Sequence, residues 1–125
     1  FMAMCNALAE CQREDGFWNV SLASPATYGG KETSGTALFL YGISWGLRKG
    51  YLKEKAFRPV ADKAWQAMKA QALHRDGFLG YVQGTGKEPK DGQPVTYDKV
   101  PDFEDFGLGC FLLGATEYYK LLGED

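Results

Sequence analysis

Four segments of the chain alternate between two kinds of hydrophobic pattern, and this alternation restricts the possible folds more than any other feature. Residues 1–12 and 57–73 place apolar side chains at spacings of three and four, which predicts helices with one face in water. Residues 34–50 and 105–122 are apolar on most sides, and a helix of this kind must be covered on most sides. We therefore expect an all-α chain with helices in the order outer, inner, outer, inner.

A short motif, Asp-Gly-Phe, follows each amphipathic segment and precedes a long polar loop. It occupies residues 15–17 and 76–78, and the loops cover residues 19–33 and 80–104. In such a motif the Asp side chain favours a turn in which the following Gly takes a positive φ. The recurrence predicts a repeat of helical hairpins, in which an outer layer of helices wraps an inner layer, as in an α/α toroid.

The two inner segments contain many glycines for helices. These are Gly35, Gly42, Gly46, Gly107, Gly109 and Gly114. Each costs about 1 kcal/mol of helix stability relative to Ala, so we expect them to permit close helix approach. Two hairpins cannot close a ring, because each repeat buries its faces against neighbouring repeats. The first helical pattern also begins at Phe1 without a capping residue, and we expect the chain to be a piece of a longer protein.

Charge and composition argue against several kinds of partner. The net charge of -2 disfavours nucleic-acid binding, which requires a basic face. No apolar run approaches the roughly 20 residues of a membrane span. The three Cys and the single His lack the spacing of a metal site, so we expect reduced thiols and no metal ion.

Both long loops run from the end of an outer helix to the start of an inner helix, so they must lie at the same end of the toroid. Inner-helix N-termini present free N–H groups there, which suit a carboxylate. We expect Thr33 or Ser34 to cap the first inner helix and Asp105 to cap the second. Trp18 either stacks on a sugar ring or fills the mouth of the toroid. Glu104 adjoins Asp105, but adjacent side chains diverge in direction, which disfavours a catalytic pair.

Four stretches in order resemble one family over nearly all of the chain. They are DGFW at 15–18, ETSGTALFLYGISWGLRKGYL at 32–52, DGFLGYVQGTG at 76–86 and DFEDFGLGCFLLGATEYYKL at 102–121. They resemble the C-terminal half of the unsaturated glucuronyl and rhamnogalacturonyl hydrolases, glycoside hydrolase families 88 and 105. One departure is Phe106, which stands where the family often has His.

The resemblance implies a fold and a place within it. The family fold is an (α/α)6 toroid, and residues 1–125 would form a single domain, the C-terminal part of that barrel. The fragment would hold about two helical hairpins with long loops at one end, and the N-terminal hairpins would be absent. The resemblance also favours a bacterial cytoplasm or periplasm, although the sequence itself leaves the compartment open.

The resemblance further implies the removal of a 4,5-unsaturated uronic acid from oligosaccharides that polysaccharide lyases produce. In this family an Asp protonates the enol-ether double bond, water adds, and the resulting hemiketal collapses, with no metal or organic cofactor. That Asp belongs to the N-terminal half, so no residue here is assigned as catalytic and the fragment should be inactive. From their positions, the expected substrate contacts are Trp18, Thr33, Ser34, Thr36 and Asp105.

The same residues leave two alternative functions open, and they predict that the chain associates with itself. Residues 12–18 also fit an element of terpene cyclases, but the chain lacks the Asp clusters that those enzymes need. A non-catalytic carbohydrate-binding or assembly module could retain the hairpins without the chemistry. Inner helices left uncovered would form a large apolar patch, so we expect the fragment to form a homo-oligomer through its exposed inner-helix faces.

Overall fold

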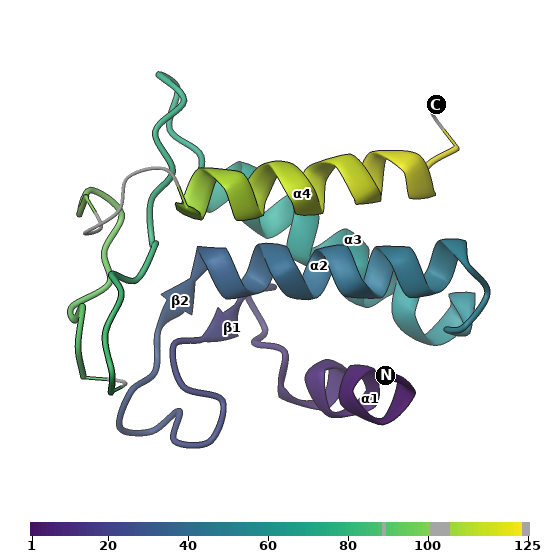
Figure 1. Ribbon diagram of the computed structural model, residues 1–125, viewed down its shortest axis with the longest axis horizontal. Helices are drawn as coiled ribbons and strands as arrows, with labels where there is room; N and C mark the ends of the chain where they lie inside the picture. Colours follow the sequence, from purple (N-terminus) through teal and green to yellow (C-terminus); the bar gives the residue numbers. More distant parts are fainter. Residues whose placement is uncertain (89, 101–105, 124–125) are drawn as a thin grey trace.

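The computed structural model describes residues 1–88, 90–100 and 106–123 (Figure 1). Its elements in chain order are α1 (Met2–Cys11), β1 (Trp18–Asn19), β2 (Lys31–Glu32), α2 (Thr33–Arg48), α3 (Glu54–Gln71) and α4 (Phe106–Leu121). All four expected helices are confirmed. The two short strands pair in antiparallel fashion, with Trp18 opposite Glu32, and thereby close the first long loop.

Helix α3 begins at Glu54, which corrects the expected start at Phe57. Pro59 consequently lies inside the helix, where it cannot donate the backbone hydrogen bond to the carbonyl of Lys55. Lys55 is exposed, so water can bond to this carbonyl and the helix continues past the proline.

The inner helices α2 and α4 run side by side, and both start at the end of the molecule where the loops gather (Figure 1). They approach closely at Gly114, where an added Cβ would lie 2.5 Å from the carbonyl oxygen of Ala37. Towards the other end, Arg48 forms an ion pair of 2.7 Å with Glu117, which is buried. By contrast, a Cβ at Gly42 or Gly109 would meet nothing within 4 Å among the described residues, so no other described helix approaches closely at these two glycines.

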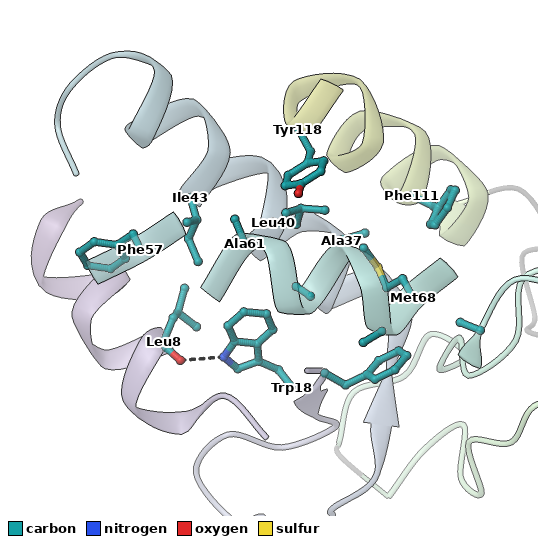
Figure 2. Close-up of a cluster of buried hydrophobic side chains, with 14 of the residues drawn as sticks. Leu8, Trp18, Ala37, Leu40, Ile43, Phe57, Ala61, Met68, Phe111 and Tyr118 are labelled. Atoms are coloured by element: carbon teal, nitrogen blue, oxygen red, sulfur yellow. Dashed lines mark hydrogen bonds between the residues drawn. The ribbon is translucent and has the colours of Figure 1, made fainter. Parts of the chain in front are cut away.

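The outer helices cover another side of α2, and α3 contacts α4 as well. Leu40 and Ile43 of α2 lie in the core with Phe57 and Ala61 of α3, and Leu8 of α1 joins them (Figure 2). Tyr118 of α4 donates a hydrogen bond of 2.7 Å to Asp62 of α3. Burial and this carboxylate raise the pKa of Tyr118 to about 12. The prediction that amphipathic helices shield apolar ones is therefore confirmed for this side of α2.

The inner helices are not covered all round within this chain. Exposed apolar side chains on α2 and α4 are Leu38, Tyr41, Leu108, Leu112, Leu113 and Tyr119. This exposure is expected of an incomplete toroid, because the neighbouring hairpins that would bury these faces are not among the described residues.

The two Asp-Gly-Phe motifs form the expected turns. In each, the Asp carboxylate accepts a hydrogen bond from the N–H of the Phe two residues later, at 3.2 Å for Asp15 and 3.1 Å for Asp76. Gly16 and Gly77 have φ values of 95° and 91°, a region that glycine enters without steric cost.

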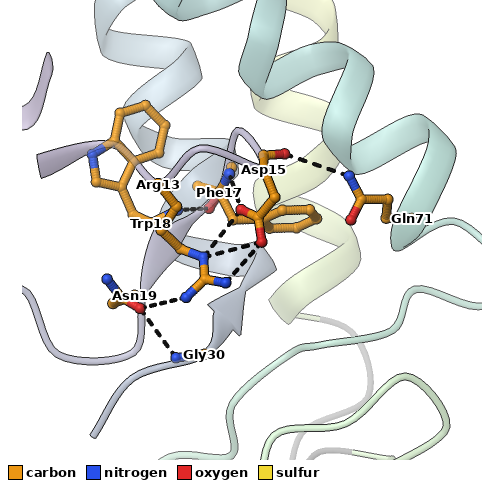
Figure 3. Close-up of polar contacts among 8 residues, drawn as sticks. Arg13, Asp15, Phe17, Trp18, Asn19, Gly30 and Gln71 are labelled. Carbon is orange, nitrogen blue, oxygen red and sulfur yellow. Dashed lines mark hydrogen bonds and ion pairs between the residues drawn. The ribbon is translucent and has the colours of Figure 1, made fainter. Parts of the chain in front are cut away.

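The first turn is held by further polar contacts (Figure 3). Arg13 donates to Asp15 at 2.7 Å and to Asn19 at 2.6 Å, and Gln71 of α3 donates to the Asp15 carbonyl at 3.4 Å. Burial acts to raise the pKa of the Asp15 carboxyl, but the hydrogen bonds from Arg13 and from Phe17 outweigh it and hold the pKa below its usual value.

Two alanine substitutions in α4 distinguish the effect of close packing on stability from the effect of helix propensity. We expect Gly114→Ala to lower the free energy of unfolding by about 2–3 kcal/mol, because the methyl group would collide with the α2 backbone. Gly109→Ala should raise it by about 0.5–1 kcal/mol, since Ala is the better helix former and the space is open. Urea denaturation followed by circular dichroism measures both. Equal effects of the two changes would contradict this account of α2–α4 packing.

Candidate functional site

The two long loops meet at the N-terminus of α2, as the sequence predicted. Thr33 donates twice to the second loop, through its backbone N–H to the carbonyl of Tyr81 at 2.8 Å and through its hydroxyl to the carbonyl of Gly80 at 2.7 Å. Tyr81 in turn donates to the carbonyl of Thr96, which fastens the far part of that loop to the same place. The loops therefore form one surface at this end of the helices.

Glu32, at the end of β2, caps α2. Its carboxylate accepts hydrogen bonds from the N–H and the hydroxyl of Ser34, at 3.0 and 2.7 Å, and from the N–H of Gly35 at 2.6 Å. It also accepts one from the N–H of Gln83 in the second loop at 3.2 Å. The expectation that Thr33 or Ser34 caps this helix is therefore wrong. The N-cap residue is the buried Glu32, whose side chain accepts hydrogen bonds from the N–H groups of Ser34 and Gly35.

Thr33 and Thr36 belong to the framework of the site. Both are fully buried, and both hydroxyls are already engaged within the chain. The Thr36 hydroxyl donates to the Glu32 carbonyl at 2.7 Å and accepts from the N–H of Trp18 at 3.0 Å. These hydroxyls position the loops against α2 and have no surface for a sugar.

Trp18 is a core residue, which corrects the idea of a stacking platform. Only 1% of its surface is exposed, and its indole N–H donates to the carbonyl of Leu8 at 2.8 Å (Figure 2). Its ring meets Phe39 edge-on with ring centroids 5.3 Å apart. Trp18 thus fills the space between Leu8 of α1 and Phe39 of α2.

A pocket of about 460 Å³ opens beside the cap of α2. Its lining residues are Glu32, Ser34, Gln83, Gly84, Thr85, Gly86, Lys87, Glu88 and Phe106. Ser34 is thus the predicted contact residue that reaches a pocket, and Asp105 and its neighbour Glu104 lie outside the residues that the structure describes. Phe106, the first residue of α4, lines the pocket from the second inner helix.

Asp91 shapes one wall of this pocket. Its carboxylate accepts from the backbone N–H groups of Lys87 and Glu88 at 2.9 and 3.1 Å, and its carbonyl accepts from the Gln83 side chain at 2.9 Å. These bonds tie Gln83, Lys87 and Glu88 to Asp91, and the Lys87 side chain is exposed. The lining of the pocket therefore combines hydroxyl and amide groups with one lysine, Lys87, and two acidic residues, Glu32 and Glu88, which suits a polar ligand.

The described part of the chain contains neither a cluster of metal ligands nor a helix that could span a membrane. No group of three or more His, Cys, Asp or Glu side chains is arranged there to hold a metal ion. No helix in residues 1–88, 90–100 and 106–123 has the length and apolar character to cross a bilayer. Cys5, Cys11 and Cys110 are free thiols, and burial raises the pKa of Cys5 and Cys110.

The family model of Glycosyl Hydrolase Family 88 matches residues 1–122, so the chain belongs to this family. A curated relative, the unsaturated 3S-rhamnoglycuronyl hydrolase of Formosa agariphila, is 36% identical over 121 residues. The match covers 97% of this chain but only 30% of the relative. The chain thus spans about a third of the length of this relative.

Solved structures agree with the family. The family 88 glycosyl hydrolase from Bacteroides vulgatus is 40% identical with a TM-score of 0.86, over 97% of this chain and 34% of that one. A possible member of the GH105 family from Salmonella enterica is 31% identical with a TM-score of 0.77, over 95% and 30%. The four helices are accordingly an incomplete (α/α)6 toroid, which confirms the fold class expected from the sequence.

Replacement of Glu32 tests the cap. We expect Glu32→Ala to lower the free energy of unfolding by about 1–2 kcal/mol and to speed hydrogen exchange at Gln83, because the α2 donors and this loop amide lose their acceptor. Glu54→Ala in the first turn of α3 is the control, since its exposed ion pair with Arg58 is worth about 0.5 kcal/mol or less. Unchanged exchange at Gln83 would show that Glu32 does not hold the second loop.

Proposed function

We propose that residues 1–125 are the C-terminal part of a glycoside hydrolase that removes a 4,5-unsaturated uronic acid from the non-reducing end of lyase-generated oligosaccharides. The observation that carries this proposal is the family 88 match along residues 1–122. The name of the Formosa agariphila relative, an unsaturated rhamnoglycuronyl hydrolase, supports the same substrate class.

The proposed reaction starts at the enol-ether double bond of the unsaturated sugar. A carboxylic acid donates a proton to one carbon of that bond, and water adds to the other carbon and forms a hemiketal. The hemiketal then collapses to a ketone, which breaks the bond to the ring oxygen, opens the ring and leaves a hemiacetal at C1. That hemiacetal breaks down to an aldehyde, which cleaves the glycosidic bond and releases the remaining saccharide with its hydroxyl group restored. We place the proton donor in the N-terminal part of the enzyme, outside residues 1–125, as the resemblance to the family implies.

The chain would contribute one wall of the binding groove. The Ser34 hydroxyl donates to Glu32, so its oxygen is left to accept a hydrogen bond from a sugar hydroxyl. Lys87, whose side chain is exposed, lines the same pocket and would attract the uronate carboxylate, while the nearby Glu88 is paired with Lys90. The positive end of the α2 dipole favours negative charge at this end as well, although the Glu32 carboxylate already occupies its first donors.

Family membership argues against a terpene cyclase. An active hydrolase and a module that binds carbohydrate without cleaving it could both belong to the family. A turnover assay distinguishes them.

A turnover assay tests the function. The full product of the reading frame that contains these residues should consume the ultraviolet absorbance of an unsaturated uronyl disaccharide, and the 125-residue chain should not. Ser34→Ala in the full product should raise KM several-fold, by about 1 kcal/mol of lost binding, with a smaller effect on kcat. Thr27→Ala, at an exposed site in the first loop, is the control. Turnover by the isolated chain would overturn the assignment of the acid to the remainder of the enzyme.

The isolated chain is also proposed to self-associate through its inner-helix faces. Leu38, Tyr41 and Leu113 are 45%, 38% and 53% exposed on α2 and α4, a large apolar surface for a chain of this size. Light scattering of the 125-residue chain should give a mass above that of the monomer, and Leu38→Gln with Leu113→Gln should restore the monomer. A wild-type monomer at high concentration would contradict the proposal.

A further inference from the structure

Tyr81, at the start of the second long loop, has an unusual backbone conformation. Among the described residues it is the one non-glycine residue with a positive φ, 56°. A residue with a Cβ enters this left-handed region only at a cost in free energy, because the Cβ crowds the following carbonyl oxygen. Such a conformation persists where the surrounding structure holds it in place, and it is concentrated at functional sites.

The backbone at this position is bonded to remote segments. The carbonyl of Tyr81 accepts from the N–H of Thr33 at 2.8 Å, and its N–H donates to the carbonyl of Thr96 at 2.9 Å. The preceding residue, Gly80, donates to the carbonyl of Ala72 at 2.8 Å and accepts from the Thr33 hydroxyl at 2.7 Å. All of these bonds use backbone atoms of the loop, so they would be available to any side chain at position 81.

The side chain of Tyr81 is held by three others. Its ring lies edge-on to Phe17 of the first turn, with centroids 6.3 Å apart, and 5.8 Å from the ring of Tyr97. The Nζ atom of Lys31 in β2 lies 5.0 Å from the centroid of the Tyr81 ring, within the range of a cation–π interaction. Tyr97 in turn stacks on His74, with centroids 3.5 Å apart. The ring therefore joins the first turn and β2 to the second loop.

Two residues after Tyr81, the chain forms a wall of the pocket at Ser34. The N–H of Gln83 donates to the Glu32 carboxylate at 3.2 Å, and both Gln83 and Gly84 line the pocket. Tyr81 is not among the described residues that line it. Because the backbone angles of Tyr81 set the direction of the chain towards Gln83, this residue can affect the pocket without touching its contents.

We propose that Tyr81 is a positioning residue for the binding pocket. Its ring, held by three neighbouring side chains, keeps the left-handed turn in place, and the turn directs Gln83 to the Glu32 carboxylate. The inference deepens the proposed function and rests on it, because the pocket is taken as part of the uronate-binding groove. A residue that acts in this way contributes to substrate affinity, with little effect on a proton transfer whose donor we place outside residues 1–125.

Three replacements of Tyr81 in the full product of the reading frame distinguish the ring from the backbone. Tyr81→Ala should raise KM for an unsaturated uronyl disaccharide about five-fold and change kcat by less than about two-fold, because the ring contacts are lost. Tyr81→Phe retains the ring and its attraction for Lys31, so it should keep the wild-type KM. Tyr81→Gly adopts a positive φ freely but has no ring, so it should resemble Tyr81→Ala. A wild-type KM for Tyr81→Gly would overturn the role of the ring.

Hydrogen exchange in peptides that contain Gln83, measured on the full product without substrate, gives a second readout. Tyr81→Ala should speed exchange of the Gln83 amide about ten-fold, because the loop is no longer held against Glu32. Tyr51→Ala is the matched control. The Tyr51 ring packs on Trp45 with centroids 5.3 Å apart, beyond the C-terminal end of α2, so its removal should leave KM and this exchange unchanged.

The outcomes separate positioning from stability and from the proposed function. Equal exchange at Gln83 in Tyr81→Ala and Tyr51→Ala would overturn the proposal, and so would an active Tyr81→Ala enzyme with the wild-type KM. A merely structural role would lower Tm and leave KM and this exchange as in the control. Exchange is measured without substrate, so the expected change in exchange without any turnover would count against the proposed function alone.

Discussion

The carboxylate of Glu32 joins the parts of the structure on which the site depends. It caps α2, orients Ser34 and binds the amide of Gln83 in the second loop. A buried carboxylate is stable only where hydrogen bonds replace its water, and here four donors do so. Two loops far apart in the sequence therefore share one acceptor, and the pocket between them has a defined shape.

Helix α2 is the central element of the chain. Its faces receive α3 on one side and α4 on another, and glycine makes the second contact possible. The apolar faces of α2 and α4 are exposed because a toroid buries each inner helix only when its neighbouring hairpins are present. The exposed side chains of Leu108, Leu112 and Tyr119 on α4 have this same cause.

The sequence predicted the location of the candidate site correctly, but it predicted few of the residues that line it. Connectivity alone placed both loops at one end, and Ser34 does line a pocket there. Glu32 was missed because capping preferences favour the Thr and Ser that follow it, and only the strand geometry shows that its carboxylate reaches their amides. Trp18 was left between two roles, because an aromatic side chain has the same apolar character in a core and on a sugar-binding surface.

The sequence by itself determined the four helices, the two Asp-Gly-Phe turns and the family, because helical periodicity, turn chemistry and motif order are local properties of the chain. Tertiary structure alone decided which of the inner-helix glycines pack against another helix, which threonines are buried and which apolar side chains of α4 are exposed. These features depend on the distance between segments that are remote in sequence. A local pattern shows that a face is apolar, but only the packed chain shows whether anything covers it.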